Sequence, residues 1–377
     1  MRHRVLQVFT TLQRGGMERQ TLNLVRALRA SDEYEVHAAA LGADGPIRSE
    51  LAELGIRDVP RFPLRRLYDA AAVRQFAAFA RLLRSCGAGF DIVHTHDFYT
   101  NTFALPAAAL CRVPVRIGSR RELDVFSGRQ RLVERTVLRL ASAVAANCET
   151  LARRLVAEGV AERKVRVLTN GIGTRVANPE AACRFRMELG IAREAPVVSM
   201  LANLHNTRKD FGTFVRAAAR IRACRQNVTF VIAGAGDPRD VHALAAAHDG
   251  DVRLLTPGAL ADIEPLLSAS HALVHTAHSE GLPNAVLEAM AYAVPVVATA
   301  VGGTTELVHS GVTGFSVVPG DAKGIAEHVL RLLANPQGGE SVGKRGQAHV
   351  RQHYSLERQA EALFRFYAEL LREARRR

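Results

Sequence analysis

The chain has 377 residues, of which 48% are hydrophobic and 6% aromatic. This length exceeds what one ordinary hydrophobic core accommodates and predicts two domains of a globular protein. No apolar run reaches the ~20 residues that span a bilayer, and the N-terminus lacks a signal-like segment. We therefore expect a cytoplasmic protein that is not integral to a membrane. The five cysteines stand singly, which disfavours a zinc site and a disulfide framework: Cys86, Cys111, Cys148, Cys183 and Cys224.

The net charge of +13 comes mainly from the first half, where residues 1–169 hold 27 Lys and Arg against 17 Asp and Glu. The arginines that cluster in this half are Arg61, Arg65, Arg66, Arg112, Arg116, Arg120, Arg121, Arg129, Arg131, Arg135 and Arg139. Such a surface attracts an anionic membrane face or a phosphate-bearing acceptor, which predicts peripheral contact with the inner face of the membrane. A compositional bias spread over a solvated surface is the alternative. No nucleic-acid-binding motif accompanies the charge, so no nucleic-acid partner is expected.

Strand-like and helix-like segments alternate along the first half, as in a doubly wound parallel sheet. Residues 3–9 predict the first strand, residues 12–16 a glycine turn, and residues 17–29 an amphipathic helix. Further apolar runs predict strands at residues 34–41, 91–95, 113–117, 142–146 and 165–168. The first domain is expected to end near residue 172.

Two motifs of the first half fall where strands end. Gly15 and Gly16 follow the first strand, where the absence of Cβ atoms lets backbone amides approach a diphosphate. Such a pair is also common in an ordinary turn. His94 and His96 end a later strand and share one of its faces, because side chains alternate along a strand. Only Asp97 supplies a further ligand type nearby, so zinc is not expected, and a structural role stays open for either histidine.

The second half repeats the alternation after a polar passage over residues 173–196. Strands are predicted at residues 197–201, 228–233, 252–255, 271–275, 295–298 and 315–317. Arg208 and Lys209 follow the first of these strands and precede a helix, so their charges can converge on a diphosphate. A charged helix start is the alternative interpretation.

Two further patterns of the second half argue against other ligands. Gly234 lies in a G-x-G turn after a strand, but Arg239 stands where a dinucleotide fingerprint needs its third glycine. NAD binding is therefore not expected. Asp249 and Asp251 form a D-x-D pattern directly before a predicted strand, which is typical of a turn and not of a metal site.

The segment from His275 to Glu306 holds a strand end, two glutamates and two glycine turns. Helical periodicity begins at Pro283, which suits a first helical turn. Glu280 is predicted on the loop before this helix and Glu288 two turns into it, so both carboxylates can face a ligand at the carboxyl end of a strand. Two solvated glutamates are the alternative.

The start of this helix is itself a candidate anion site. Backbone amides at a helix N-terminus favour phosphate or sugar oxygens without a metal. The residues that supply this end of the helix are Gly281, Leu282, Pro283 and Asn284.

The string SEGLPNAVLEAMAYAVPVVAT over residues 279–299 closely resembles the donor-site signature of retaining glycosyltransferases of the GT-B fold, family 4. GGMER after the first strand and NGI at residues 170–172 resemble two loops of the same family. The resemblance implies two Rossmann-like α/β domains facing a cleft. Residues 1–172 would form the acceptor side and residues 173–354 the donor side, with a helix over residues 355–377 crossing back to complete the first domain.

The resemblance also implies roles for the groups near the transferred sugar. Glu280 would contact the hydroxyls of this sugar near the reaction centre, and Glu288 would hold the nucleotide ribose. One histidine of the strand end would bond a sugar hydroxyl, and we prefer His96 to His94 for this role. Glu280 is then a positioning group and not a covalent nucleophile.

The phosphates and the base are assigned in the same way. The loop with Gly15 and Gly16 would meet the donor phosphates and the acceptor. Lys209 would neutralise the diphosphate, and Arg208 would supply the charge that the family places where Asn203 stands in this chain. The loop of Gly234 would lie near the nucleotide base.

The sequence thus predicts a retaining, metal-independent glycosyltransferase with a nucleotide diphosphate sugar as co-substrate and no further cofactor. The acceptor would be a carbohydrate or a lipid-linked intermediate of polysaccharide or glycolipid synthesis. Val294 stands where the family usually has glycine, and His278 where serine is common, which bears on the sugar preference. A sugar-nucleotide 2-epimerase of similar fold and a non-catalytic nucleotide-sugar-binding protein are the alternatives.

Overall fold

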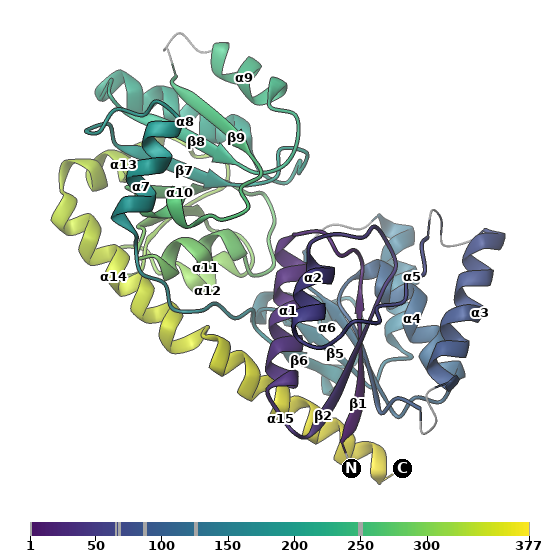
Figure 1. Ribbon diagram of the computed structural model, residues 1–377. Coiled ribbons are helices and arrows are strands. Elements are labelled where there is room, and N and C mark those ends of the chain that lie inside the picture. The colour runs from purple at the N-terminus through teal and green to yellow at the C-terminus, as the bar shows by residue number, and fades with distance from the viewer. Residues whose placement is uncertain are drawn as a thin grey trace. The chain divides into compact units, whose positions relative to one another are not determined.

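The computed structural model of the chain describes residues 2–64, 66, 69–85, 89–123, 127–247 and 252–376. It divides into two compact units, one formed by Met1–Gly171 with Leu356–Arg377 and the other by Ile172–Ser355. Each unit holds a six-stranded parallel sheet covered by helices on both faces (Figure 1). Asp249 and Asp251 lie outside the described residues.

The first sheet has the order β2-β1-β3-β4-β5-β6. Its strands are β1 His3–Phe9, β2 Tyr34–Ala40, β3 Ile92–Thr95, β4 Val115–Arg120, β5 Ala143–Ala146 and β6 Val165–Val167. The helices of this unit are α1 Gly16–Arg29, α2 Ile47–Glu53, α3 Ala70–Ser85, α4 Phe98–Leu110, α5 Gly128–Leu138, α6 Glu149–Ala157 and α15 Leu356–Arg375.

The second sheet has the order β12-β11-β10-β7-β8-β9. Its strands are β7 Val197–Leu201, β8 Thr229–Ala233, β9 Leu254–Gly258, β10 Ala272–His275, β11 Val296–Thr299 and β12 Phe315–Val317. The helices of this unit are α7 Pro179–Glu188, α8 Phe211–Cys224, α9 Arg239–Ala246, α10 Glu264–Ala269, α11 Asn284–Ala291, α12 Thr304–Leu307, α13 Ala322–Ala334 and α14 Pro336–His353. Within the described ranges, no helix is both long enough and apolar enough to cross a bilayer.

The central strands are buried on both faces, which is why they read as nearly continuous apolar runs. In β1, Val5 and Phe9 pack into the core that contains α1 and α15. Leu6 and Val8 point to the opposite face and pack against α3 and α4. The sequence prediction of a doubly wound α/β fold with two Rossmann-like domains is therefore confirmed.

Two strands differ by more than one residue in their limits from the prediction. The strand predicted at residues 113–117 begins at Val115, because Pro114 has no N–H for the ladder, and it continues to Arg120. The strand predicted at residues 252–255 runs from Leu254 to Gly258, because one extra residue in β9 between two of its pairs with β8 lets Gly258 pair with Ala233.

The C-terminal helix α15 is joined to the first sheet by a buried chain of hydrogen bonds, and it lies against α1 in Figure 1. The hydroxyl of Tyr367 accepts a bond from Nε2 of Gln7 at 2.8 Å and lies 2.8 Å from Nδ1 of His94. Nε2 of His94 lies 2.9 Å from Oγ of Ser119. Because a neutral imidazole has one N–H, one ring nitrogen of His94 donates and the other accepts in this chain of bonds. Burial lowers the pKa of His94 to about 3, so this ring is neutral.

We predict that neutral His94 makes the stability of the first unit depend on pH. Below the ordinary pKa of 6.5, His94 is protonated in the unfolded chain, whereas in the folded unit it stays neutral down to about pH 3. The free energy of unfolding therefore falls as pH falls. From about pH 8 to about pH 5, the wild type should lose roughly 2 kcal/mol relative to His94→Gln, which cannot titrate. Hydrogen exchange of β1 and β3 peptides measures this difference, and parallel pH curves for the two proteins would contradict it.

Candidate active site

The centre of the second unit's site lies between β7 and β10, where the strand order of the sheet reverses. Loops that follow such neighbouring strands leave in opposite directions and form a crevice at the carboxyl edge. Here the two loops are tied by backbone bonds, from the Asp210 amide to the Thr276 carbonyl and from the His278 amide to the Arg208 carbonyl, both 3.0 Å long. Lys209 and Ala277 form a bridge between them. The backbone thus fixes Lys209 beside the segment that leads to Glu280.

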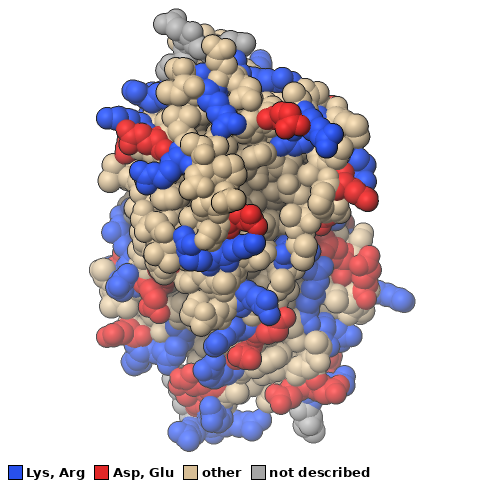
Figure 2. Space-filling view, turned by 90° about the vertical axis from the view of Figure 1, so that its left-hand side faces the viewer, with Lys and Arg blue, Asp and Glu red and all other residues tan. Residues whose placement is uncertain are grey.

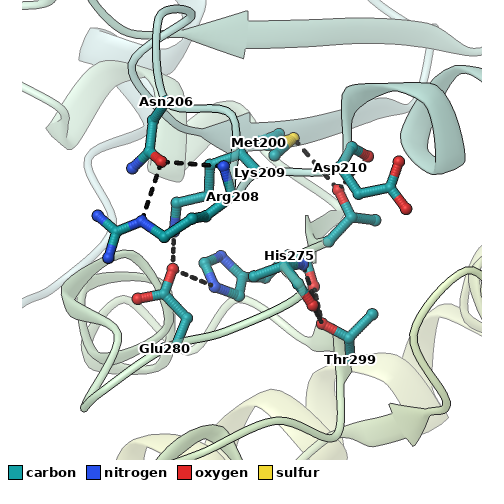
Figure 3. Close-up of polar contacts among 10 residues, drawn as sticks. Met200, Asn206, Arg208, Lys209, Asp210, His275, Glu280 and Thr299 are labelled. Carbon is teal, nitrogen blue, oxygen red and sulfur yellow. Dashed lines mark hydrogen bonds and ion pairs between the residues drawn. The ribbon is translucent and has the colours of Figure 1, made fainter. Parts of the chain in front are cut away.

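Lys209 and Glu280 form an ion pair at this point (Figure 3). Nζ of Lys209 donates to Oε1 of Glu280, and the two side chains are only 11% and 17% exposed. Burial by itself would raise the pKa of Glu280, but Lys209 and His275 outweigh burial and hold this pKa at about 2. Glu280 is therefore an anion at neutral pH, and the sequence-predicted pair lies in direct contact.

His275 is a third member of this cluster that the sequence analysis did not identify. It ends β10, its side chain is fully buried, and its Nε2 lies 3.4 Å from the same Oε1 of Glu280. Burial and the neighbouring ammonium of Lys209 lower its pKa, so the ring is neutral. The available signal was a histidine at the end of an otherwise apolar strand, directly before the loop of Glu280.

Arg208 and Asp210 flank Lys209 with separate partners. Nε of Arg208 donates to Oδ1 of Asn206 at 3.3 Å. The carboxylate of Asp210 accepts from the Thr213 amide at 2.9 Å and caps α8. These bonds hold the loop that presents Lys209 at the start of the helix.

The helix after Glu280 starts one residue later than predicted. Pro283 is the N-cap of α11 and the first helical residue is Asn284, so Glu288 lies one turn into the helix and not two. The reason is the extended backbone of Pro283, whose ψ is 114°. Gly281, whose carbonyl accepts from the Gly303 amide at 2.9 Å, and Leu282 connect Glu280 to this helix start. Glu288 is half-buried on α11.

Gly234 is required for close packing between two loops. A Cβ at this position would overlap the carbonyl of Ala202 in the loop after β7. The Ala235 amide then donates to Oδ1 of Asn203 at 3.0 Å, and the Leu204 amide to the Ala235 carbonyl at 2.7 Å. The side chain of Asn203 thus ties the two loops together.

In the first unit, β1 and β3 are the neighbouring strands at the order reversal, and they place His96 at the carboxyl edge. His96 is buried, with Nε2 2.7 Å from Oε1 of Gln7 and Nδ1 3.3 Å from a guanidinium nitrogen of Arg121. Burial holds the pKa of His96 well below its usual range. The neutral ring donates to Gln7 and accepts from Arg121. To bond a sugar hydroxyl, His96 has to give up one of these partners.

The glycine loop of the first unit lies at the same edge. Gly15 is the N-cap of α1 and Gly16 its first residue. A Cβ at Gly15 would overlap the carboxylate of Glu18, which accepts from Oγ1 of Thr11 at 3.1 Å. Burial raises the pKa of Glu18 above its usual range. Glycine here makes room for this carboxyl group next to the loop.

Two arginines that were predicted to face an anionic surface are turned inward. Arg120 is buried, bonded to Glu158 and 3.6 Å from Glu134, whose pKa burial raises to about 7. Arg121 donates to Oδ1 of Asn170 at 3.1 Å as well as contacting His96. The sequence did not indicate that these two arginines are buried, because their burial depends on partners that lie far along the chain.

No three His, Cys, Asp or Glu side chains are arranged to hold a metal ion in the part of the chain that the structure describes. His94 and His96 face one another with ring centroids 4.4 Å apart, as their alternation in the strand predicts. Their nitrogens bond to protein groups instead.

Comparison with known proteins identifies the family of this chain. Residues 195–335 match the family described as glycosyl transferases group 1, and residues 14–176 match glycosyltransferase family 4. The D-inositol 3-phosphate glycosyltransferase of Kribbella flavida is 26% identical over 367 residues, which cover 89% of this chain and 86% of that protein. The lipopolysaccharide core biosynthesis glycosyltransferase LpsE of Rhizobium meliloti is 30% identical over 209 residues, 55% of this chain and 58% of LpsE.

Among solved structures, HepE of Anabaena in complex with UDP-glucose has the same fold. The TM-score is 0.86 at 21% identity, and the match covers 97% of this chain and 99% of HepE. The two family matches together span both units. The chain therefore belongs to family 4 of the glycosyltransferases, a family of retaining, metal-independent enzymes with the GT-B fold.

Proposed function

We propose that this glycosyltransferase moves a hexose from a UDP-sugar to a saccharide or lipid-linked acceptor in polysaccharide or glycolipid synthesis. The observation that carries the proposal is the buried pair of Lys209 and Glu280 at the order reversal of the second sheet. The complex of HepE with UDP-glucose supports the choice of donor, and the name of LpsE supports this class of product.

Catalysis in this proposal is mainly electrostatic. The bond between the anomeric carbon and the phosphate oxygen breaks, and negative charge develops on the departing diphosphate. Lys209, Arg208 and the amides at the start of α11 stabilise this charge, because oriented donors in a site of low water content need little reorganisation. The acceptor oxygen bonds to the anomeric carbon on the face that the phosphate leaves, and its proton passes to the leaving phosphate oxygen.

Glu280 serves as an acceptor of hydrogen bonds in this scheme. With a pKa of about 2, its carboxylate is ionised and has no proton to donate at neutral pH. It is suited to hold the hydroxyls of the transferred sugar, while Glu288 on α11 accepts from the ribose. His96 in the first unit exchanges Gln7 or Arg121 for a sugar hydroxyl.

The direct test is incubation of the protein with UDP-, GDP- and ADP-sugars and a panel of acceptors, followed by mass spectrometry of the products. A glycosylated acceptor from a UDP-sugar is the expected result. An isomer of the donor formed without any acceptor would identify an epimerase instead. Donor binding without turnover on any acceptor would identify a binding protein.

We predict that Lys209→Met lowers kcat/KM for the UDP-sugar by roughly 100- to 1,000-fold, the usual effect of removing one donor of transition-state charge. The substitution keeps the length of the side chain but leaves both Glu280 and the diphosphate without their cation. Lys323→Met on α13 is the matched control, because Lys323 is 75% exposed, and its activity should equal that of the wild type. Calorimetry with UDP-glucose checks donor binding, and an unchanged affinity would remove Lys209 from the site.

The proposed membrane contact is the outward face of α5. Leu132 and Val133 are 57% and 43% exposed on this helix, and Arg129 and Arg135 are exposed beside them. A helix that presents basic and apolar side chains together binds at the interface of an anionic bilayer. The face shown in Figure 2 differs, because Lys and Arg there are interspersed with Asp and Glu.

We predict that the protein binds phosphatidylglycerol vesicles, that binding falls as salt rises, and that replacing Arg129 and Arg135 by glutamine weakens it. Each basic residue near an anionic surface contributes about 1 kcal/mol, so the double variant should bind roughly 30-fold more weakly. Vesicle co-sedimentation measures this. Glutamine at Arg184 and Arg193, exposed in the second unit, should leave binding unchanged. Equal losses in both double variants would assign binding to net charge alone.

A further inference from the structure

In the cluster of Lys209, Glu280 and His275, donor binding changes the partner of a buried carboxylate. Oε1 of Glu280 receives the ammonium of Lys209 and has Nε2 of His275 3.4 Å away (Figure 3). The proposed function requires the same ammonium to contact a diphosphate. The diphosphate and Glu280 therefore compete for one cation, and a buried carboxylate that loses its partner is strongly unfavourable.

His275 is placed to replace that partner. Its ring is fully buried, and neither ring nitrogen has a well-formed hydrogen bond within the described residues. The charged groups that act on the ring are Lys209, from the loop before α8, and Glu280, from the loop before α11. Asp210, the next carboxylate along the first loop, has other partners. It accepts from the Thr213 amide at the start of α8, and Nε2 of His278 lies 3.6 Å away.

The two neighbours of His275 act on its charge in opposite directions. The ammonium of Lys209 disfavours the imidazolium, and the carboxylate of Glu280 favours it. A diphosphate that engages Lys209 cancels much of the first effect and leaves the second. The imidazolium then becomes the favoured form without any large movement of the ring.

We propose that His275 is a positioning residue that takes up a proton when the diphosphate of the donor engages Lys209, and then holds Glu280 against the transferred sugar. The proton comes from solvent, Nε2–H donates to Oε1 of Glu280, and the proton returns to solvent when the nucleoside diphosphate leaves and Lys209 pairs with Glu280 again. This inference rests on the proposed function.

Calorimetry of UDP-glucose binding near neutral pH, in buffers of different ionisation enthalpy, tests the inference. The diphosphate of UDP-glucose is esterified at both ends and has no proton to exchange near neutrality, so net uptake reports the protein. We expect wild-type uptake approaching one proton for each UDP-glucose bound. His275→Gln should bind UDP-glucose with no uptake, and His353→Gln, which changes an exposed histidine on α14, should retain it.

The pH profile gives a second reading that a purely structural histidine would not alter. Between the pKa of His275 in the free protein and its pKa in the complex, the affinity of the wild type for UDP-glucose should fall by about tenfold for each pH unit, the slope of one linked proton. His275→Gln should lack this slope. If that variant does not fold, ring-nitrogen NMR of wild-type His275 with and without UDP-glucose still shows whether it gains a proton.

Binding of UDP-glucose to the wild type without proton uptake would overturn the inference, as would uptake that persists in His275→Gln. Neither result would affect the proposed transferase activity. Failure of every nucleotide sugar to bind or react would instead defeat the proposed function itself.

Discussion

The site of the second unit depends on the reversal of strand order between β7 and β10. Parallel strands on either side of such a point send their loops apart, and the carboxyl edge between them becomes the place where two distant segments meet. Backbone hydrogen bonds between residues 208–210 and 276–278 hold the two loops at a fixed distance from each other. A cation and an anion 71 residues apart in sequence thereby become a buried pair.

The first sheet has the same reversal between β1 and β3, but the chemistry placed there is different. His94 and His96 are neutral because of burial, and they are linked through Gln7 and Tyr367 into one chain of hydrogen bonds. Neutral donors and acceptors suit hydroxyl groups, whereas the charged cluster of the second unit suits a diphosphate. The division of work proposed for the two units thus follows from the side chains at two equivalent positions of similar sheets.

The sequence predicts those properties that are local or periodic. Buried strands, the alternation with helices and the loop positions of Lys209 and Glu280 follow from apolar runs and from where those runs end. Partners that lie far along the chain are not visible in this way. Arg120 has the same sequence signal as the exposed arginines of its cluster, and its burial depends on Glu134 and Glu158. Gly234 also has a packing role beside Ala202 that the sequence does not reveal. His275 was missed because its importance depends on an atom of Glu280, not on spacing.

The resting ion pair has a consequence for how the donor binds. A buried ion pair contributes little net stability, because desolvation of both charges offsets their attraction, whereas loss of either partner is costly. Lys209 is therefore already stripped of most of its water before any donor arrives, and an incoming diphosphate exchanges with an anion instead of desolvating a cation. The cost of this exchange is that Glu280 loses its cationic partner while it stays buried. The same carboxylate oxygen faces only Lys209 and His275 among the described ionisable groups within salt-bridge distance. The cost that this exchange adds to donor binding therefore depends on how well the imidazole takes over the charge.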